Sequence, residues 1–178
     1  MALAERRISA TEARIAGLEL PRGGWTEAAR QDALARLRAM GLPERRDEYW
    51  RFTRPDTLSQ AETPRAALFK PEETEIFSDL DRLKIVFVDG VFDAAQSDDL
   101  SLEGVTVERL ADASVTDIHW ARDLYGTLEA RGQVPVQRPF AALNTAFATD
   151  GLMIHVTGKP SKPISLVYVH DSETSDAI

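Results

Sequence analysis

Two stretches near the amino terminus place hydrophobic residues at helical spacing. The pattern predicts helices over residues 2–16 and 27–40, with the chain-breaking segment Pro21-Arg22-Gly23-Gly24 between them. Thr26 is expected to cap the start of the second helix, and Gly41 to supply the left-handed residue after its end. The stripe of this helix that is predicted to face a core consists of Ala33, Leu34, Leu37 and Met40.

Strand signals dominate the middle of the chain. Residues 54–80 carry several prolines and carboxylates, which predicts a long irregular connection. Residues 84–88 then predict a strand, Asp89-Gly90 a two-residue hairpin turn, and Val91-Phe92 the start of the return strand. The alternation over residues 105–110 predicts a third strand.

Two further helices are predicted after these strands, over residues 116–130 and 139–148. Pro139 suits the first position of the second helix, because its missing N–H has no helical partner there. The expected apolar faces are Ile118, Ala121, Leu124, Tyr125 and Leu128 in the first helix, and Phe140, Leu143 and Phe147 in the second.

Two apolar strands, residues 152–156 and 164–170, are predicted near the carboxyl end of the sequence. Two strands need neighbours to pair with and a second layer to cover them. We therefore expect that the chain is a piece of a longer protein, and that the edges of these strands either pair with another copy or are disordered.

These elements predict an α+β fold in three parts. Residues 1–55 form an amino-terminal helical region, and residues 56–137 form a small α/β region with the hairpin at Asp89-Gly90. Residues 138–178 supply a helix and the closing strands.

The charge and composition of the chain narrow its function classes. The 178 residues carry a net charge of −8, which disfavours binding to nucleic-acid phosphates. The sequence has no run of roughly 18 apolar residues that could span a membrane and no secretory signal, so the cytoplasm is the expected location. The absence of cysteine excludes disulfides, thiolate catalysis and cysteine-ligated clusters within this chain.

The densest group of chemically distinctive side chains is Glu48, Trp50, Arg51, Phe52 and Thr53. Trp50 could anchor a partner protein, since Trp is enriched at the centre of interfaces. Alternatively, Trp50 and Phe52 lie on the same face of a strand and fill the core, with Glu48 and Arg51 as a local ion pair. The nearby carboxylates of Glu44, Asp47 and Glu48 alternate with arginines and predict a surface charge network.

Three histidines raise the question of a metal site. His155 and His170 lie on what are predicted to be neighbouring strands, which leaves open a small metal-dependent enzyme that uses both. The sequence offers no further ligand at a defined spacing from them, and His119 is remote. We therefore expect no catalytic, cofactor or metal residue, and the sequence also has no nucleotide-binding glycine motif.

Three segments of the sequence resemble those of a known protein family. The first is Gly41-Leu42-Pro43-Glu44-Arg45-Arg46-Asp47-Glu48-Tyr49-Trp50-Arg51-Phe52-Thr53. The second is Arg138-Pro139-Phe140-Ala141-Ala142-Leu143-Asn144-Thr145-Ala146-Phe147, followed by Asp150-Gly151-Leu152-Met153-Ile154-His155-Val156. The third is Phe87-Val88-Asp89-Gly90-Val91-Phe92, which is similar to a hairpin of that family, with Asp89 in place of Asn. Together these segments resemble the SufB/SufD family of iron–sulfur cluster assembly proteins, and SufD in particular.

The resemblance implies a non-catalytic scaffold subunit that pairs with a SufB-like sister and a SufC-like ATPase. It implies that the final strands open a right-handed parallel β-helix, truncated here, with Asn144 as a cap of that solenoid. The full complex would assemble the iron–sulfur cluster, and this portion would hold no cofactor. A generic protein-interaction module remains an alternative.

Overall fold

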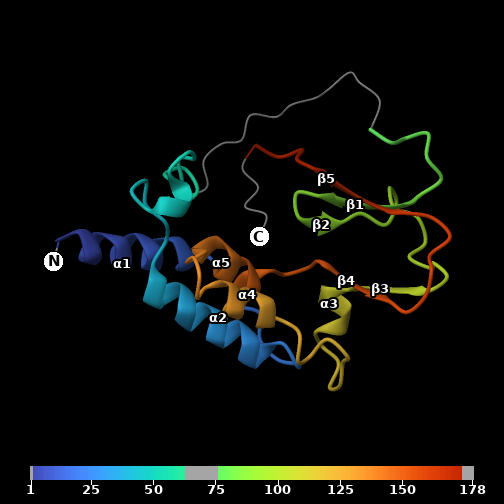
Figure 1. Ribbon diagram of the computed structural model, residues 1–178, viewed down its shortest axis with the longest axis horizontal. Helices are drawn as coiled ribbons and strands as arrows, with labels where there is room; N and C mark the ends of the chain where they lie inside the picture. The colour runs from blue at the N-terminus through green and yellow to red at the C-terminus, as the bar shows by residue number, and fades with distance from the viewer. Residues whose placement is uncertain (1, 63–75, 174–178) are drawn as a thin grey trace. The chain divides into compact units, whose positions relative to one another are not determined.

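The computed structural model describes residues 2–62 and 76–173 and has a mixed α+β fold (Figure 1). The described chain divides into two compact units, each discontinuous in sequence. Unit 1 holds residues 2–62 and 113–149, and unit 2 holds residues 76–112 and 150–173. The three-part division predicted from the sequence stays a prediction.

Unit 1 is helical and is centred on α2 (Glu27–Met40) and α5 (Pro139–Phe147). Its core joins Ala33 and Leu37 of α2 with Ala142 and Ala146 of α5, and Ile15 of α1 (Ala2–Ile15) packs there too. Buried alanines lack long side chains, so the two helix axes can approach closely. The predicted stripes of both helices and the placement of Pro139 at the start of α5 are confirmed.

Both ends of α2 depart from simple capping. The Thr26 side chain makes no capping hydrogen bond, so that prediction is wrong. Its Oγ1 instead accepts a hydrogen bond from Arg30 Nε at 3.2 Å. Gly41 follows α2 with φ 69° and ψ 163°, a positive-φ conformation but not the left-handed helical one that was expected.

The prediction of a helix over residues 116–130 is wrong for most of that range. Only α4 (Thr127–Gly132) is helical there, and Gly126 precedes it with a φ of 74°. Ile118, Leu124 and Leu128 are exposed, so the expected apolar face is not buried as a unit. The segment before α4 is held instead by ring stacking and single hydrogen bonds, which the helical spacing did not reveal.

Unit 2 contains two small sheets that share a core. In the first sheet, β1 (Leu83–Val88) lies between β2 (Val91–Phe92), which is antiparallel, and β5 (Ile164–Val169), which is parallel. In the second sheet, β3 (Val105–Arg109) pairs antiparallel with β4 (Leu152–Val156), and the short helix α3 (Leu110–Ala113) follows β3. The shared core consists of Leu83, Ile85, Phe87 and Leu102, with Val105, Val107, Leu152 and Ile164 packed against it.

The hairpin between β1 and β2 forms as predicted. Asp89 and Gly90 have positive φ values of 49° and 83°, which a tight turn between twisted antiparallel strands requires. Asp89 also accepts hydrogen bonds from the backbone of Asp171 and Ser172, after β5. The turn therefore also fastens the end of the parallel strand.

The two closing strands are not neighbours, contrary to the prediction, because β4 pairs with β3 and β5 pairs with β1. Leu152 packs against the shared core, but Ile154 and Val156, the alternate residues that follow it in β4, are exposed. Both strands find partners within the chain, and β5 lies at the edge of its sheet in the part that the structure describes. No helix of the described residues is long and apolar enough to cross a membrane.

Candidate interaction cleft

The segment that follows α2 is fastened to α1 by a buried threonine. Thr11 Oγ1 accepts a hydrogen bond from the backbone N–H of Leu42 at 2.9 Å and donates one to the carbonyl of Arg7 at 2.8 Å. Thr11 and Leu42 are both buried, so this contact is shielded from competing water. Residues 41–44 therefore start from a fixed point beside α1.

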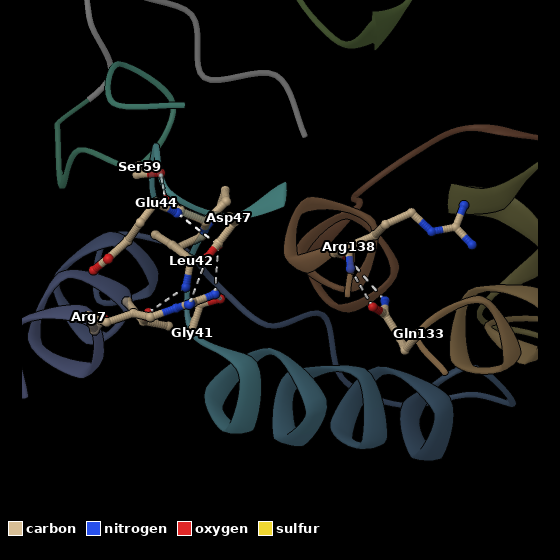
Figure 2. Close-up of polar contacts among 10 residues, drawn as sticks. Arg7, Gly41, Leu42, Glu44, Asp47, Ser59, Gln133 and Arg138 are labelled. Atoms are coloured by element: carbon tan, nitrogen blue, oxygen red, sulfur yellow. Dashed lines mark hydrogen bonds and ion pairs between the residues drawn. The ribbon is translucent and has the colours of Figure 1, made fainter. Parts of the chain in front are cut away.

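An ion pair between Arg7 of α1 and Asp47 is the second contact that holds this segment against α1, and Figure 2 shows it beside Gly41 and Leu42. Arg7 donates to both carboxylate oxygens of Asp47, at 3.4 and 3.2 Å, and to the carbonyl of Gly41 at 3.4 Å. Asp47 also accepts from the backbone N–H of Glu44 at 3.0 Å, which closes the turn 44–47. Ser59 donates to the carbonyl of Pro43 at 3.2 Å and holds the other side of the segment (Figure 2).

A cleft of about 610 Å³ lies between α1 and this segment, and we name it the arginine cleft. Its lining residues are Arg6, Arg7, Ala10, Leu42, Pro43, Glu44, Arg45, Arg46, Asp56 and Ser59. The lining includes four arginines and two acidic residues, in a chain whose net charge is −8. The cleft is therefore a local reversal of the overall charge.

Gly41 is required at the edge of the cleft for two reasons. Its φ of 69° disfavours any residue with a side chain, and an added Cβ would lie 2.7 Å from Arg7 Cγ. We expect Gly41→Ala to lower the free energy of unfolding by about 1–2 kcal/mol and to displace Arg7 from Asp47. Urea denaturation followed by tryptophan fluorescence measures this loss, since Trp25, Trp50 and Trp120 all lie in unit 1.

Gly17→Ala is the matched control, because nothing lies within 4 Å of a Cβ at Gly17. This variant should be as stable as the parent or slightly more stable. Equal effects of the two substitutions would contradict the role assigned to Gly41.

Trp50 and Phe52, the two aromatic residues that were expected to fill the core together, lie in different environments. Trp50 belongs to a 3₁₀ turn, η1 (Glu48–Trp50), and packs edge-on against Phe140 of α5, with ring centroids 5.3 Å apart. Phe52 is 93% exposed, so the expected strand with both rings in the core is wrong. The Trp50 ring is therefore part of the packing of unit 1, and Phe52 is not.

The remaining predicted residues lie on the surface. Glu48 and Arg51 form the expected local ion pair at 3.9 Å, and Arg51 lies over the Phe52 ring. Thr53 is exposed, and Asn144 is exposed on α5, so its role as a solenoid cap stays a prediction.

The histidines do not converge. His155 lies on β4 and His170 directly follows β5, and these strands belong to different sheets. His119 stacks on Trp25 with ring centroids 4.8 Å apart. No group of three or more His, Asp or Glu residues that could hold a metal occurs in the described part of the chain.

A buried arginine in unit 1 was not anticipated from the sequence. Arg30 donates to the carbonyls of Ala146 and Ala148 at 3.1 and 2.7 Å, and its guanidinium lies 5.5 Å from the Tyr125 ring centroid. Burial lowers the pKa of Arg30 and raises the pKa of Tyr125, while the coulombic interaction between them opposes both shifts. The signal was available, because Arg30 precedes Ala33, Leu34 and Leu37 at the helical spacing of the buried stripe.

A second unanticipated residue is Asp150 in unit 2. One carboxylate oxygen accepts hydrogen bonds from Arg109, and the other accepts from the backbone N–H groups of Ala111 and Gly151 at 3.1 and 2.8 Å. The hydrogen bond to Asp150 raises the pKa of Arg109. Asp150 thus joins the end of β3, the start of α3 and the start of β4, a role that its position after a helix did not indicate.

Comparison with known proteins identifies the family. Residues 24–164 match the family described as the SufBD protein N-terminal region. A search of curated proteins gives no match. The matched range contains the fastened segment after α2, the hairpin, α5 and β4. Because it matches the N-terminal region of these proteins, the chain belongs to the SufB/SufD family, a family of scaffolds for iron–sulfur cluster assembly in SUF complexes.

Proposed function

We propose that the chain is the amino-terminal part of a SufD-like, non-catalytic scaffold subunit. The observation that carries the proposal is the family match over residues 24–164, which covers most of the chain. The three segments that resemble SufD lie within that match. The cluster is the cargo of the assembly in this proposal, and this portion of the protein holds no cofactor of its own.

The proposed architecture continues into a parallel β-helix. Its support is the pairing of β1 with β5, because a parallel β-helix is built from parallel ladders and this pair is parallel over six residues. β5 lies at the edge of the described sheet and would present its open side to a further strand. Self-association through strand edges and location in the cytoplasm stay predictions.

The proposed partners are a SufB-like sister subunit and a SufC-like ATPase. We expect the natural protein, expressed with both, to be recovered with them as one complex on affinity purification. We also expect its gene to restore growth, under iron limitation, of a bacterial strain that lacks SufD.

The matched control is a strain that lacks SufB, which the gene should not rescue. Rescue of the SufB-deficient strain alone would contradict the SufD assignment and leave the family membership intact. Failure to recover either partner would contradict the scaffold proposal itself.

A further inference from the structure

The arginine cleft carries positive charge that the described residues do not neutralise. Arg6, Arg45 and Arg46 are exposed, and within residues 2–62 and 76–173 no ion pair joins any of them to a carboxylate. Arg7, by contrast, is committed to Asp47. The cleft therefore presents three guanidinium groups to solvent around a fourth that is fixed.

The walls of the cleft are held in place before any ligand arrives. One wall is α1, and the other is residues 42–46. The hydrogen bond between Leu42 and Thr11 and the ion pair between Asp47 and Arg7 hold this segment against α1. Preorganised walls lower the entropy that a ligand must overcome on binding. The apolar residues of the lining are Ala10, Leu42 and Pro43, and we name them the floor of the cleft.

The mixture of arginines and acidic residues in the cleft favours an extended ligand with spaced negative charges. Guanidinium groups bind carboxylates and phosphates with paired hydrogen bonds. Glu44 and Asp56 also line the cleft, and they would repel a compact polyanion such as a nucleotide. An extended peptide can set its carboxylates against the arginines and place neutral or basic residues opposite Glu44 and Asp56.

We propose that the arginine cleft binds an extended, predominantly acidic segment of a partner protein. Carboxylates of the segment pair with Arg6, Arg45 and Arg46, and small apolar side chains between them contact the floor. The proposal rests on the geometry of unit 1 and does not depend on whether the protein is SufD-like. Failure of the complementation experiment therefore leaves it standing, and failure of peptide binding leaves the scaffold proposal standing.

The test measures binding of the full chain to a fluorescein-labelled peptide of alternating Glu and Ala residues. Fluorescence anisotropy should show saturable binding that weakens as salt is raised, because exposed ion pairs are screened. The double variant Arg45→Glu and Arg46→Glu should weaken binding about tenfold or more, and Arg6→Glu alone should weaken it by a smaller factor. Circular dichroism establishes that each variant is folded.

The matched control is the double variant Arg22→Glu and Arg122→Glu, at two arginines that are exposed and lie outside the cleft. This control changes the net charge by the same amount and should leave the affinity within about twofold. A peptide of alternating Gln and Ala should not bind. The proposal is overturned if the two double variants weaken binding equally, if the acidic peptide does not bind, or if inorganic triphosphate binds the cleft more tightly than the peptide does.

Discussion

Replacing Arg30 with alanine should lower the free energy of unfolding of unit 1 by about 3–5 kcal/mol. Arg30 is 1% exposed, and its removal leaves the carbonyls of Ala146 and Ala148 without their donor in a buried place. It also leaves a cavity beside Tyr125 and removes a cation from the carboxyl end of α5, where the helix dipole favours positive charge. The loss is measured by urea denaturation with tryptophan fluorescence, which reports on unit 1 alone.

Two substitutions bracket this result. Arg30→Lys keeps a positive charge but cannot reach Thr26 Oγ1 and both carbonyls together. It should therefore lower the free energy of unfolding by an intermediate amount. Arg38→Ala removes an arginine from the same helix, where it pairs with Glu12 at 3.0 Å on an exposed surface, and should cost less than about 1 kcal/mol. Similar losses for Arg30→Ala and Arg38→Ala would show that burial of Arg30 is not what stabilises the packing of α2 on α5.

Replacing Asp150 with asparagine should destabilise unit 2 by about 2–4 kcal/mol. The Asp150 side chain is 8% exposed and accepts hydrogen bonds from Arg109, Ala111 and Gly151. Asparagine keeps the shape but removes the charge, and its NH₂ group cannot accept a hydrogen bond. Amide hydrogen exchange at β3 and β4 measures the effect, because unit 2 contains no tryptophan.

Asp112→Asn is the control for this prediction. Asp112 also pairs with Arg109, at 3.6 Å, but its side chain is 73% exposed, so the expected loss is below about 1 kcal/mol. Equal changes in amide exchange for the two variants would contradict the role of Asp150 as the junction of β3, α3 and β4.

The elements that sequence reasoning predicted well are those whose signals are local. The stripe of α2 and the Asp89-Gly90 turn depend on neighbouring residues, and both form as expected. Thr26 and residues 116–126 were mispredicted because distant contacts decide them. Thr26 accepts a hydrogen bond from Arg30, whose guanidinium is held by the distant carbonyls of Ala146 and Ala148. His119 stacks on Trp25, far away in the sequence.

The sequence does not predict which strands pair or that a cleft lined by arginines forms. The alternation of residues 152–156 and 164–170 predicts two strands, but alternation alone does not specify which strands pair with each other. The cleft requires Arg6 and Arg7 of α1 to lie beside Arg45 and Arg46, which no periodicity reveals. The sequence indicates a surface charge network for Arg45 and Arg46, but nothing in it links them to Arg6 and Arg7.

The parallel ladder between β1 and β5 has a consequence for biosynthesis. Leu83 pairs with Ile164, so β1 leaves the ribosome long before its parallel partner has been translated. Closing so long a loop is slow, and until β5 is translated, β1 has an unpaired edge on the side where β5 will bind. A chaperone that holds this strand during translation would therefore raise the yield of correctly folded protein.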